Sequence, residues 1–549
     1  MVRGRLLGRF RRGGRLCHLR HLGRWEVLAT VHARAQPHRH AGQRLCHHWP
    51  DRRQHEGHGA IPGQADVRHR HPHPRQRCRQ VQEQQLRPSP ERRWMPPGGA
   101  DGGEEGPAAS AGLGHGYVGQ NAQRHGGRRP ICRYHQGRRS ELSEMSRHPN
   151  APSTMDTDAA VRRHLPHVTD LRHHLHRIPE LGYEEVQTAA AIRQELDRLG
   201  ISHVDGVEGA PTATVAWIGD SSRPCIALRA DIDALPIAEE TGLPYASTHP
   251  GRMHACGHDG HMAVLLGAAA VLKDIEKQLP VCVKLIFQPA EEGGGGAARL
   301  VEAGVLDGRF GPKVSAIFGL HGWPALKVGL VATKPGALLA ATDNFSATFI
   351  GRGCHGAYPH LGADPIAAAC EATLSLQQVV SRDLDPTEPA VVTVGIIQGG
   401  TAVNIIPDRA TIQGTARTLT DGARQLVRRC IERRCAGVAS AGGCRLEFEW
   451  SEGYPATIND PAMADYVAKV AREALGADRF IPVARPSMGG EDFAHYLQAV
   501  PGCFFLLGVQ PQDRHEYPSL HSAHFDFTDD ALATGMAMFV QLAGGYATM

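Results

Sequence analysis

Between residues 186 and 320, short apolar runs alternate with segments of helical periodicity, and this alternation restricts the fold more than any other feature. Four short runs are rich in apolar and β-branched residues and are therefore expected to be strands: 212–218, 225–229, 281–287 and 314–320. The expected helices are 186–199, 259–273 and 297–306. Strands that alternate with helices in this way predict an α/β domain with a mostly parallel sheet and helices on both faces.

Around residue 342 the pattern changes to that of an α+β unit. The expected strands here are 344–350, 391–397, 409–417 and 445–449, and the expected helices are 364–380 and 423–439. This composition predicts an antiparallel sheet with helices on one side. A further helix (461–475), a strand (504–508) and a late histidine, His521, follow it. We therefore expect a catalytic domain in two parts, 155–341 and 454–549, that is interrupted by an inserted lid, 342–453.

The first 154 residues have a different composition. They are rich in Arg, His, Gly, Pro and Gln, and no window has a sustained period of 3.6 or 2. Such a segment cannot bury enough apolar surface to offset the entropy lost on ordering, so it is expected to be disordered or mistranslated and not a domain. A basic nucleic-acid-binding tail and a targeting peptide are the alternatives, but aromatic residues are sparse and no apolar run is present. We expect a start site that is assigned too early, with Met145 or Met155 as the true start.

Charge and cysteine usage restrict the possible partners and the cellular compartment. The formal net charge of +4 comes from the basic N-terminal segment, and the remainder is mildly acidic, so no nucleic-acid partner is indicated. No run of 18 apolar residues is present, so no membrane span is expected. Those of the 13 cysteines that follow Met155 are scattered and odd in number, which is typical of reduced thiols in a cytoplasmic protein.

Two short segments carry residues suited to a hydrolytic metal centre. His254-Ala-Cys-Gly-His-Asp259 places a thiol and an imidazole two residues apart, and Gln288-Pro-Ala-Glu-Glu-Gly293 offers two adjacent carboxylates after an apolar run. A metal-dependent hydrolase needs side chains that hold the cation and a separate carboxylate that moves protons. Two neighbouring Glu residues can divide this work, and their spacing alone leaves open which of them is the ligand.

Further polar residues lie at the ends of the expected strands. Asp231 and Asp233 follow the second strand, Glu291 and Glu292 the third, and His321 the fourth. In open α/β sheets, ligands bind beyond the carboxyl ends of the strands. The sequence therefore predicts that these side chains gather at one edge of the sheet.

Five motifs together identify a known family. They are Arg229-Ala-Asp-Ile-Asp-Ala-Leu-Pro236, His254-Ala-Cys-Gly-His-Asp-Gly-His261, Gln288-Pro-Ala-Glu-Glu-Gly293, Gly319-Leu-His-Gly322 and Gly489-Gly-Glu-Asp-Phe493. The chain after about Leu165 resembles the M20 metallopeptidases, and most closely the branch with hippurate hydrolases and auxin-conjugate hydrolases, which are N-acyl-amino-acid amidohydrolases. The resemblance implies a dinuclear-metal exopeptidase type of catalytic domain and a lid that also serves dimerisation.

The resemblance also implies roles for individual residues. The implied metal ligands are Cys256, His258, Glu292, His321 and His521. Glu291 is the implied general base. His355, within Gly353-Cys-His-Gly-Ala-Tyr-Pro-His360, matches the lid histidine that reaches the active site of the partner subunit, and Asn404 and Arg417 match lid residues that hold substrate. Cys354 and Ala523 depart from the residues common in this branch, Gly and Pro, but neither removes a ligand.

The expected activity is hydrolysis of the amide bond of N-acyl amino acids by metal-activated water, with Glu291 as the base. Mn²⁺ and Zn²⁺ are the expected ions, one or two per site, and Co²⁺ and Ni²⁺ also suit this mixed set of donors. We expect Asp231 and Asp259 to orient the ligating imidazoles. The alternatives are an M20 dipeptidase or carboxypeptidase, an N-acetyl-diaminopimelate deacetylase and, more remotely, an inactive binding homologue. The expected partners are the small-molecule substrate and a second copy of the chain.

Overall fold

The computed structural model describes residues 11–12, 15–16 and 157–546. In the first of its two compact units, β1 (Arg11–Arg12) pairs antiparallel with β2 (Arg15–Leu16). The other residues of 1–154, for which disorder or mistranslation is expected, lie outside the described residues. The candidate start sites Met145 and Met155 also lie outside them. All other described elements belong to the second unit.

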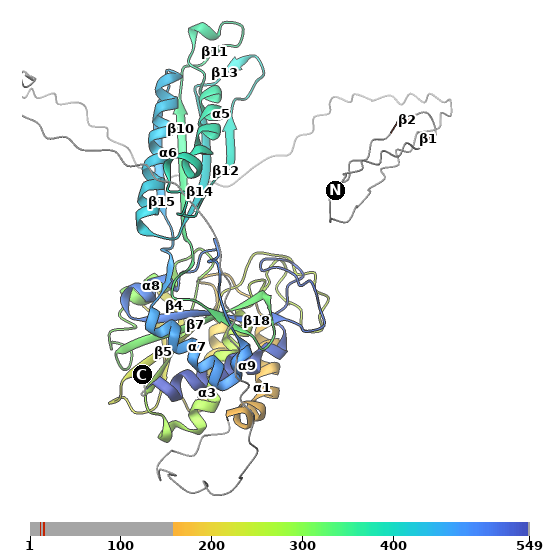
Figure 1. The fold of residues 1–549 in the computed structure, drawn as a ribbon, viewed down its shortest axis with the longest axis vertical. Helices are drawn as coiled ribbons and strands as arrows, with labels where there is room; N and C mark the ends of the chain where they lie inside the picture. The colour runs from red at the N-terminus through yellow and green to blue at the C-terminus, as the bar shows by residue number, and fades with distance from the viewer. Residues whose placement is uncertain (1–10, 13–14, 17–156, 547–549) are drawn as a thin grey trace, which may run out of the picture. The chain divides into compact units, whose positions relative to one another are not determined.

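A mixed sheet of eight strands forms the catalytic domain (Figure 1). Its strands are β3 (His203–Val207), β4 (Ala210–Ile218), β5 (Cys225–Asp231), β6 (Cys282–Gln288), β7 (Val314–Lys327), β8 (Val331–Thr333), β17 (Phe480–Pro482) and β18 (Gly502–Gln510), in the order β17-β8-β18-β7-β5-β6-β4-β3. The central strands β18, β7, β5 and β6 are parallel, whereas β4 is antiparallel to β6, and β8 is antiparallel to β18. Because β18 inserts between β7 and β8, the C-terminal part of the chain completes the sheet that the first part begins.

Helices cover both faces of this sheet. The helices are α1 (Thr157–Arg177), α2 (Val186–Arg198), α3 (His258–Asp274), α4 (Gly296–Glu302), α7 (Pro461–Leu475), α8 (Ala494–Ala499) and α9 (Leu532–Gly545). Buried side chains of α1, α2, α3, α7 and α9 share one apolar cluster with the sheet, and those of α4 and α8 share a second. The most buried of them is α3, in which every residue from Met262 to Leu272 is buried. The expected α/β architecture is thus confirmed.

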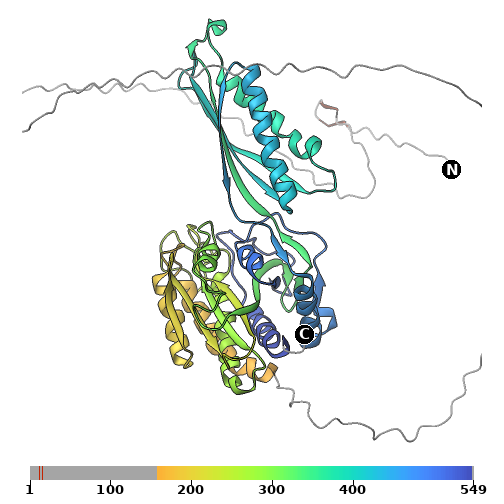
Figure 2. The same ribbon diagram turned by 90° about the vertical axis from the view of Figure 1, so that its left-hand side faces the viewer.

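The lid is a two-layer α+β domain (Figure 2). Its sheet contains β10 (Ala341–Ile350), β12 (Ala390–Gly399), β14 (Arg409–Thr418) and β15 (Arg445–Glu452), in the antiparallel order β12-β14-β10-β15. Two helices, α5 (Pro365–Leu376) and α6 (Asp421–Ala441), pack on one face and enclose an apolar core, while alternate residues of β12 and β15 are exposed. This arrangement confirms the predicted inserted α+β lid.

Two short strand pairs lie outside the two main sheets. β9 (Gly336–Leu339) pairs with β16 (Thr457–Asn459) beside the catalytic sheet, and β11 (Cys354–His355) pairs with β13 (Ile405–Ile406) in the lid. The register of β10 with β14 runs from Ala341 opposite Thr418 to Ile350 opposite Arg409. β11 follows the Ile350 end, so β11 and Arg417 belong to opposite ends of the lid sheet.

Two expectations about elements need correction. β7 continues to Lys327, so His321 lies within a strand and not after its end. The reason is that β18 pairs in parallel with β7 on both sides of His321, which extends the ladder. Helix α5 ends at Leu376, and a π-helical turn at Val379–Asp383 takes the place of its expected last turn.

Within the residues that the structure describes, no helix has both the length and the apolar content that crossing a membrane requires.

Candidate functional site

Five side chains with metal-ligating atoms converge in the catalytic domain. Cys256 and His258 flank the start of α3, His321 comes from β7, Glu292 follows β6, and His521 lies in the loop before α9. The ligating atoms of Cys256, His258 and His321 lie within 4.8 Å of one another, as do those of Cys256, Glu292 and His521. Cys256 Sγ lies 3.4 Å from His321 Nε2, and His521 Nε2 lies 3.1 Å from Glu292 Oε1. These overlapping groups contain all five predicted ligands.

Local backbone geometry brings these side chains together. Gly257 has φ of 86° and separates Cys256 from His258, and a Cβ at this position would meet the rings of Phe525 and Phe527 at 3.2 Å. His521 itself has a left-handed φ of 64°, which is uncommon for a residue other than glycine. Backbone conformations of this kind cost free energy and cluster at functional sites. The backbone of His521 is therefore strained, and this conformation directs its side chain toward the other candidate ligands.

Hydrogen bonds fix the tautomers of the two buried imidazoles. His258 Nδ1 donates to the carbonyl oxygen of Asp233 at 2.8 Å, and His321 Nδ1 donates to that of Gly322 at 2.8 Å. In the neutral form of both rings, Nε2 is therefore the nitrogen with a free lone pair, as a metal ligand requires. His258 Nε2 is buried and makes no hydrogen bond within the described part of the chain. The orientation of both rings fits a bound cation.

The charge balance of the site also fits a cation. Burial lowers the pKa of His258, but the carboxylates of Asp231 and Asp233 outweigh burial and raise it to about 10. Burial raises the pKa of Glu291 well above its usual range, and the nearby carboxylates of Glu491 and Glu292 raise it further. Bound positive charge would relieve this excess of negative groups. A thiolate, imidazoles and carboxylates together suit a borderline divalent ion.

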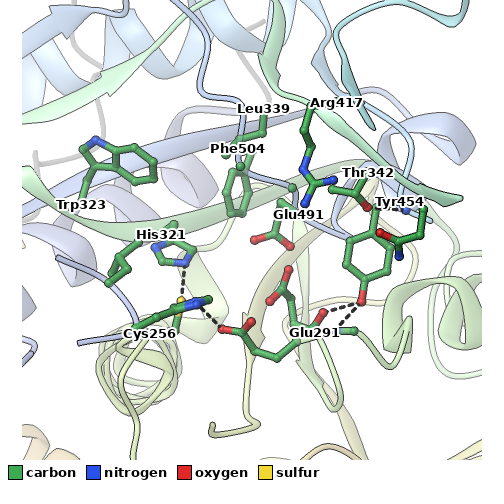
Figure 3. Close-up of a pocket in the computed structure, with 17 residues that line it drawn as sticks. Cys256, Glu291, His321, Trp323, Leu339, Thr342, Arg417, Tyr454, Glu491 and Phe504 are labelled. Carbon is green, nitrogen blue, oxygen red and sulfur yellow. Dashed lines mark hydrogen bonds and ion pairs between the residues drawn. The ribbon is translucent and has the colours of Figure 1, made fainter. Parts of the chain in front are cut away.

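Glu291 is buried and lines the same cavity as four of the five converging side chains, Cys256, Glu292, His321 and His521 (Figure 3). Its backbone carbonyl accepts a hydrogen bond of 2.6 Å from the Tyr454 hydroxyl, which in turn accepts one of 2.8 Å from Gly293 N. Ala290, the preceding residue, has a positive φ of 56°. These contacts hold the turn so that Glu291 and Glu292 both point toward the cavity.

Asp231 and Asp259 differ in what they contact. Asp231 Oδ1 lies 2.6 Å from His261 Nδ1, and its Oδ2 lies 3.5 Å from His258 Nε2. Asp259 Oδ2 instead contacts His176 Nδ1 and Arg172 NH1, both at 2.9 Å, and contacts none of the five candidate ligands in the described structure. The expectation that Asp259 orients a ligating ring therefore needs correction. Its carboxylate turns toward α1, a helix that the sequence reading missed.

Of the three predicted lid residues, only Arg417 lines the catalytic cavity. Its NH1 contacts Thr415 Oγ1 and donates to the carbonyl oxygen of Ala416 at 3.0 Å, and it forms no ion pair with a carboxylate of the described residues. His355 and Asn404 are exposed at β11 and just before β13. His355 lines a separate cavity together with Cys354. Within one chain, His355 and Asn404 are therefore not part of the catalytic cavity.

The cavity has a volume of about 510 Å³ and contains residues that the sequence reading did not select. They include Trp323, Leu339, Thr342, Tyr454, Glu491 and Phe504. Glu491 lies in the last of the five motifs, and the sequence predicts no role for it. The fully buried Arg229 links Glu491 to Asp231. The Arg229 guanidinium lies 3.0 Å from the Glu491 carboxylate and 2.8 Å from the Asp231 carboxylate. No periodicity or spacing could have selected Tyr454.

Known proteins that this chain resembles share one family. Residues 227–544 match the model of peptidase family M20/M25/M40. The chain is 40% identical to the Arabidopsis thaliana IAA-amino acid hydrolase ILR1-like 4 over 399 residues, 72% of this chain and 89% of that protein. It is 43% identical to the Bacillus subtilis N-acetyl-L-cysteine deacetylase over 354 residues, 64% of this chain and 82% of that protein. A Bacillus subtilis structure, a dinuclear metal-binding peptidase of the M20 family, matches with a TM-score of 0.61 and 38% identity over 70% of this chain and 98% of its own.

Proposed function

We propose that this chain, which belongs to peptidase family M20/M25/M40 and is a metal-dependent amidohydrolase of linear amides, cleaves N-acyl amino acids. One observation carries the choice of substrate. The catalytic cavity holds candidate metal ligands on one side and, on another, the guanidinium of Arg417, which forms no ion pair with a carboxylate of the described residues. A linear substrate with an amide at one point and a free carboxylate nearby fits both. The two named relatives act on amides of amino acids.

The residues that would hold the metal are Cys256, His258, Glu292, His321 and His521, which form two ligand groups with Cys256 in common. One or two divalent ions, of which Mn²⁺ and Zn²⁺ are the first candidates and Co²⁺ and Ni²⁺ also fit, would lower the pKa of a water molecule and polarise the amide carbonyl. Burial raises the pKa of the Cys256 thiol, and the Glu292 and Glu291 carboxylates raise it further. Metal binding is therefore expected to release the proton of this thiol.

Glu291 is the proposed general base. It is buried beside the ligand groups, and the carboxylates around it favour its uptake of a proton. A base in this position takes a proton from the attacking water and delivers it to the leaving nitrogen. Glu292 cannot share this role if its carboxylate is bound to metal. The adjacent pair then divides ligation and proton transfer between its two members.

Arg417 is the proposed partner of the substrate carboxylate. Its planar guanidinium suits two parallel hydrogen bonds to a carboxylate, and burial lowers its pKa, so an anion nearby would be favourable. We further propose that lid domains pair in a homodimer, and that His355 and Asn404 of one chain act in the site of the other. Both residues are exposed in a single chain and thus available to a partner.

Replacing Cys256 with Ser is expected to weaken metal binding rather than proton transfer. A hydroxyl is a poorer metal ligand than a thiolate. Loss of a residue that only hydrogen-bonds to a ligand typically lowers metal affinity ~10–100-fold, so we expect loss of the ligand itself to lower it at least as much. Metal content after dialysis against graded chelator concentrations measures the effect. Cys503→Ser is the matched control, because Cys503 is also buried but lies 3.4 Å from Thr333 Oγ1, away from the site. Equal metal retention in the two variants would remove Cys256 from the ligand set.

Replacing Arg417 with Gln should raise KM for N-acyl amino acids by about 10–100-fold, since a hydrogen bond to a charged group contributes about 1.5–3 kcal/mol. Substrates whose carboxylate is blocked as a methylamide cannot use Arg417. The variant and the parent enzyme should therefore cleave them equally poorly. Arg409→Gln, at the other end of β14, is the control. An equal loss for free and blocked substrates would contradict the role of Arg417.

A substrate panel tests the proposed activity itself. Hydrolysis of N-acetyl and N-benzoyl amino acids, dipeptides and N-acetyl-diaminopimelate should be compared after reconstitution with Mn²⁺, Zn²⁺, Co²⁺ or Ni²⁺. We expect the N-acyl amino acids to have the highest kcat/KM. Faster cleavage of dipeptides would replace the proposed activity with that of a dipeptidase.

A further inference from the structure

A second cavity of about 490 Å³ adjoins the catalytic cavity, and its walls are largely apolar. Trp323 and Leu339 line both cavities. The ring of Trp323 lies edge-on to that of the candidate ligand His321, with centroids 6.2 Å apart. One indole therefore borders both the candidate metal site and the second cavity.

The floor of the second cavity continues one face of the catalytic sheet. Phe504 lines the catalytic cavity and Leu506 lines the second. Residues two apart on a strand share a face, so these two side chains form one continuous surface along β18. Ala332 of β8 pairs with Leu506 and extends the floor. Both Leu506 and Ala332 belong to the same apolar cluster as Phe504 and Leu339.

The outer wall comes from β17 and the segment after it. Ile481 is 39% exposed here although it is a large apolar side chain, and Ala484 is also exposed. Of the residues that line this cavity, Arg485 is the charged one. Apolar surface that remains open beside a reaction centre is suited to an apolar part of the substrate.

The two cavities differ in chemistry in a way that orients a substrate. Figure 3 shows Trp323 and Arg417 on opposite sides of the catalytic cavity, with Cys256 and Glu291 below them. A carboxylate held by Arg417 leaves the amide over the candidate metal ligands. The acyl group then extends toward Trp323 and the second cavity.

We propose that the second cavity, bounded by Trp323, Leu339, Leu506 and Ala484, is an acyl subsite that selects N-acyl amino acids with extended apolar acyl groups. This inference rests on the proposed function and specifies its substrate class. Each methylene that enters the cavity leaves water. Full burial of a methylene gives about a fourfold gain, and because this cavity is open on one side we expect about twofold per methylene in kcat/KM.

A chain-length series tests the inference. The metal-loaded full-length enzyme is assayed with acetyl, butanoyl, hexanoyl and octanoyl derivatives of one amino acid. We expect kcat/KM to rise with each step to hexanoyl or beyond. The variant Ala484→Trp, which fills the cavity from an exposed position, should abolish this rise, so that the longer substrates are cleaved no faster than the acetyl substrate. Ala190→Trp, an exposed residue of α2, is the matched control and should keep the full series.

The outcomes separate the two proposals. Cleavage of acetyl substrates without any gain along the series, or a gain that survives in Ala484→Trp, would overturn the acyl subsite and leave the proposed function intact. Failure to cleave any N-acyl amino acid would overturn both. Competitive inhibition by the free fatty acids provides a second readout, since octanoate should inhibit the parent enzyme more strongly than butanoate and lose this advantage in Ala484→Trp.

Discussion

Glu291→Gln is expected to retain its metal and to lose at least about 100-fold in kcat, because general-base catalysis typically contributes that much or more. The amide is close in size to the carboxylate, so packing in this buried position is kept. It cannot accept a proton from water at neutral pH. Steady-state kinetics combined with metal analysis of the same sample measures both quantities.

Glu292→Gln is the matched comparison at the adjacent position. Its carboxylate belongs to a ligand group with Cys256 and His521, so this variant should lose metal affinity. Excess metal should then restore part of its activity, whereas no metal concentration should restore Glu291→Gln. If Glu291→Gln lost metal and kept its rate per bound ion, the roles of the two residues would be reversed.

The central part of the fold could be predicted because its local signals agree with the final structure. The apolar runs that became β5, β6 and β7 are buried on both faces, so they are continuous in the sequence and easily recognised. Glu292 follows β6 and His321 interrupts β7, which is why the convergence of these two ligands could be expected. β3, β8 and β17 are short, and β8 and β17 pair with strands that are distant in sequence.

The missed features depend on tertiary contacts. α1 contains Pro166 and many His and Arg residues, so its apolar stripe is weak, yet Arg172 is fully buried. It is buried because its guanidinium contacts Asp259, Asp526 and Asp529. No local pattern reports such a network. For the same reason the direction of the Asp259 side chain could not be inferred from its place beside His258.

The proposal that two chains share their active sites can be tested at His355. β10 has ten residues and separates the Arg417 end of the lid sheet from β11, a length of about 33 Å at 3.3 Å per residue. A side chain at His355 cannot span that distance to the cavity of its own chain. If it acts in catalysis, a partner chain must receive it. We propose that His355 then donates a hydrogen bond to the oxyanion that develops on the substrate carbonyl. On this role we expect His355→Ala to lower kcat by about 100-fold or more, with metal content unchanged.

His360→Ala is a control for surface changes near β11, since His360 is exposed in the same lid segment. It should leave kcat near that of the parent enzyme. Light scattering should show both variants as dimers, which is the state that we propose for the parent enzyme. A monomeric His355→Ala would indicate a role in assembly instead of catalysis.

Mixing His355→Ala with Glu291→Gln then distinguishes action within a chain from action between chains. Each variant alone is inactive, but a mixed dimer has one site with both an intact Glu291 and an intact His355 from the partner. After random exchange about half of the dimers are mixed, so about a quarter of the parent activity should return. Exchange is verified with differently tagged chains. Full exchange without recovered activity would mean that His355 does not act in the site of the partner, and the proposed sharing of sites would be wrong.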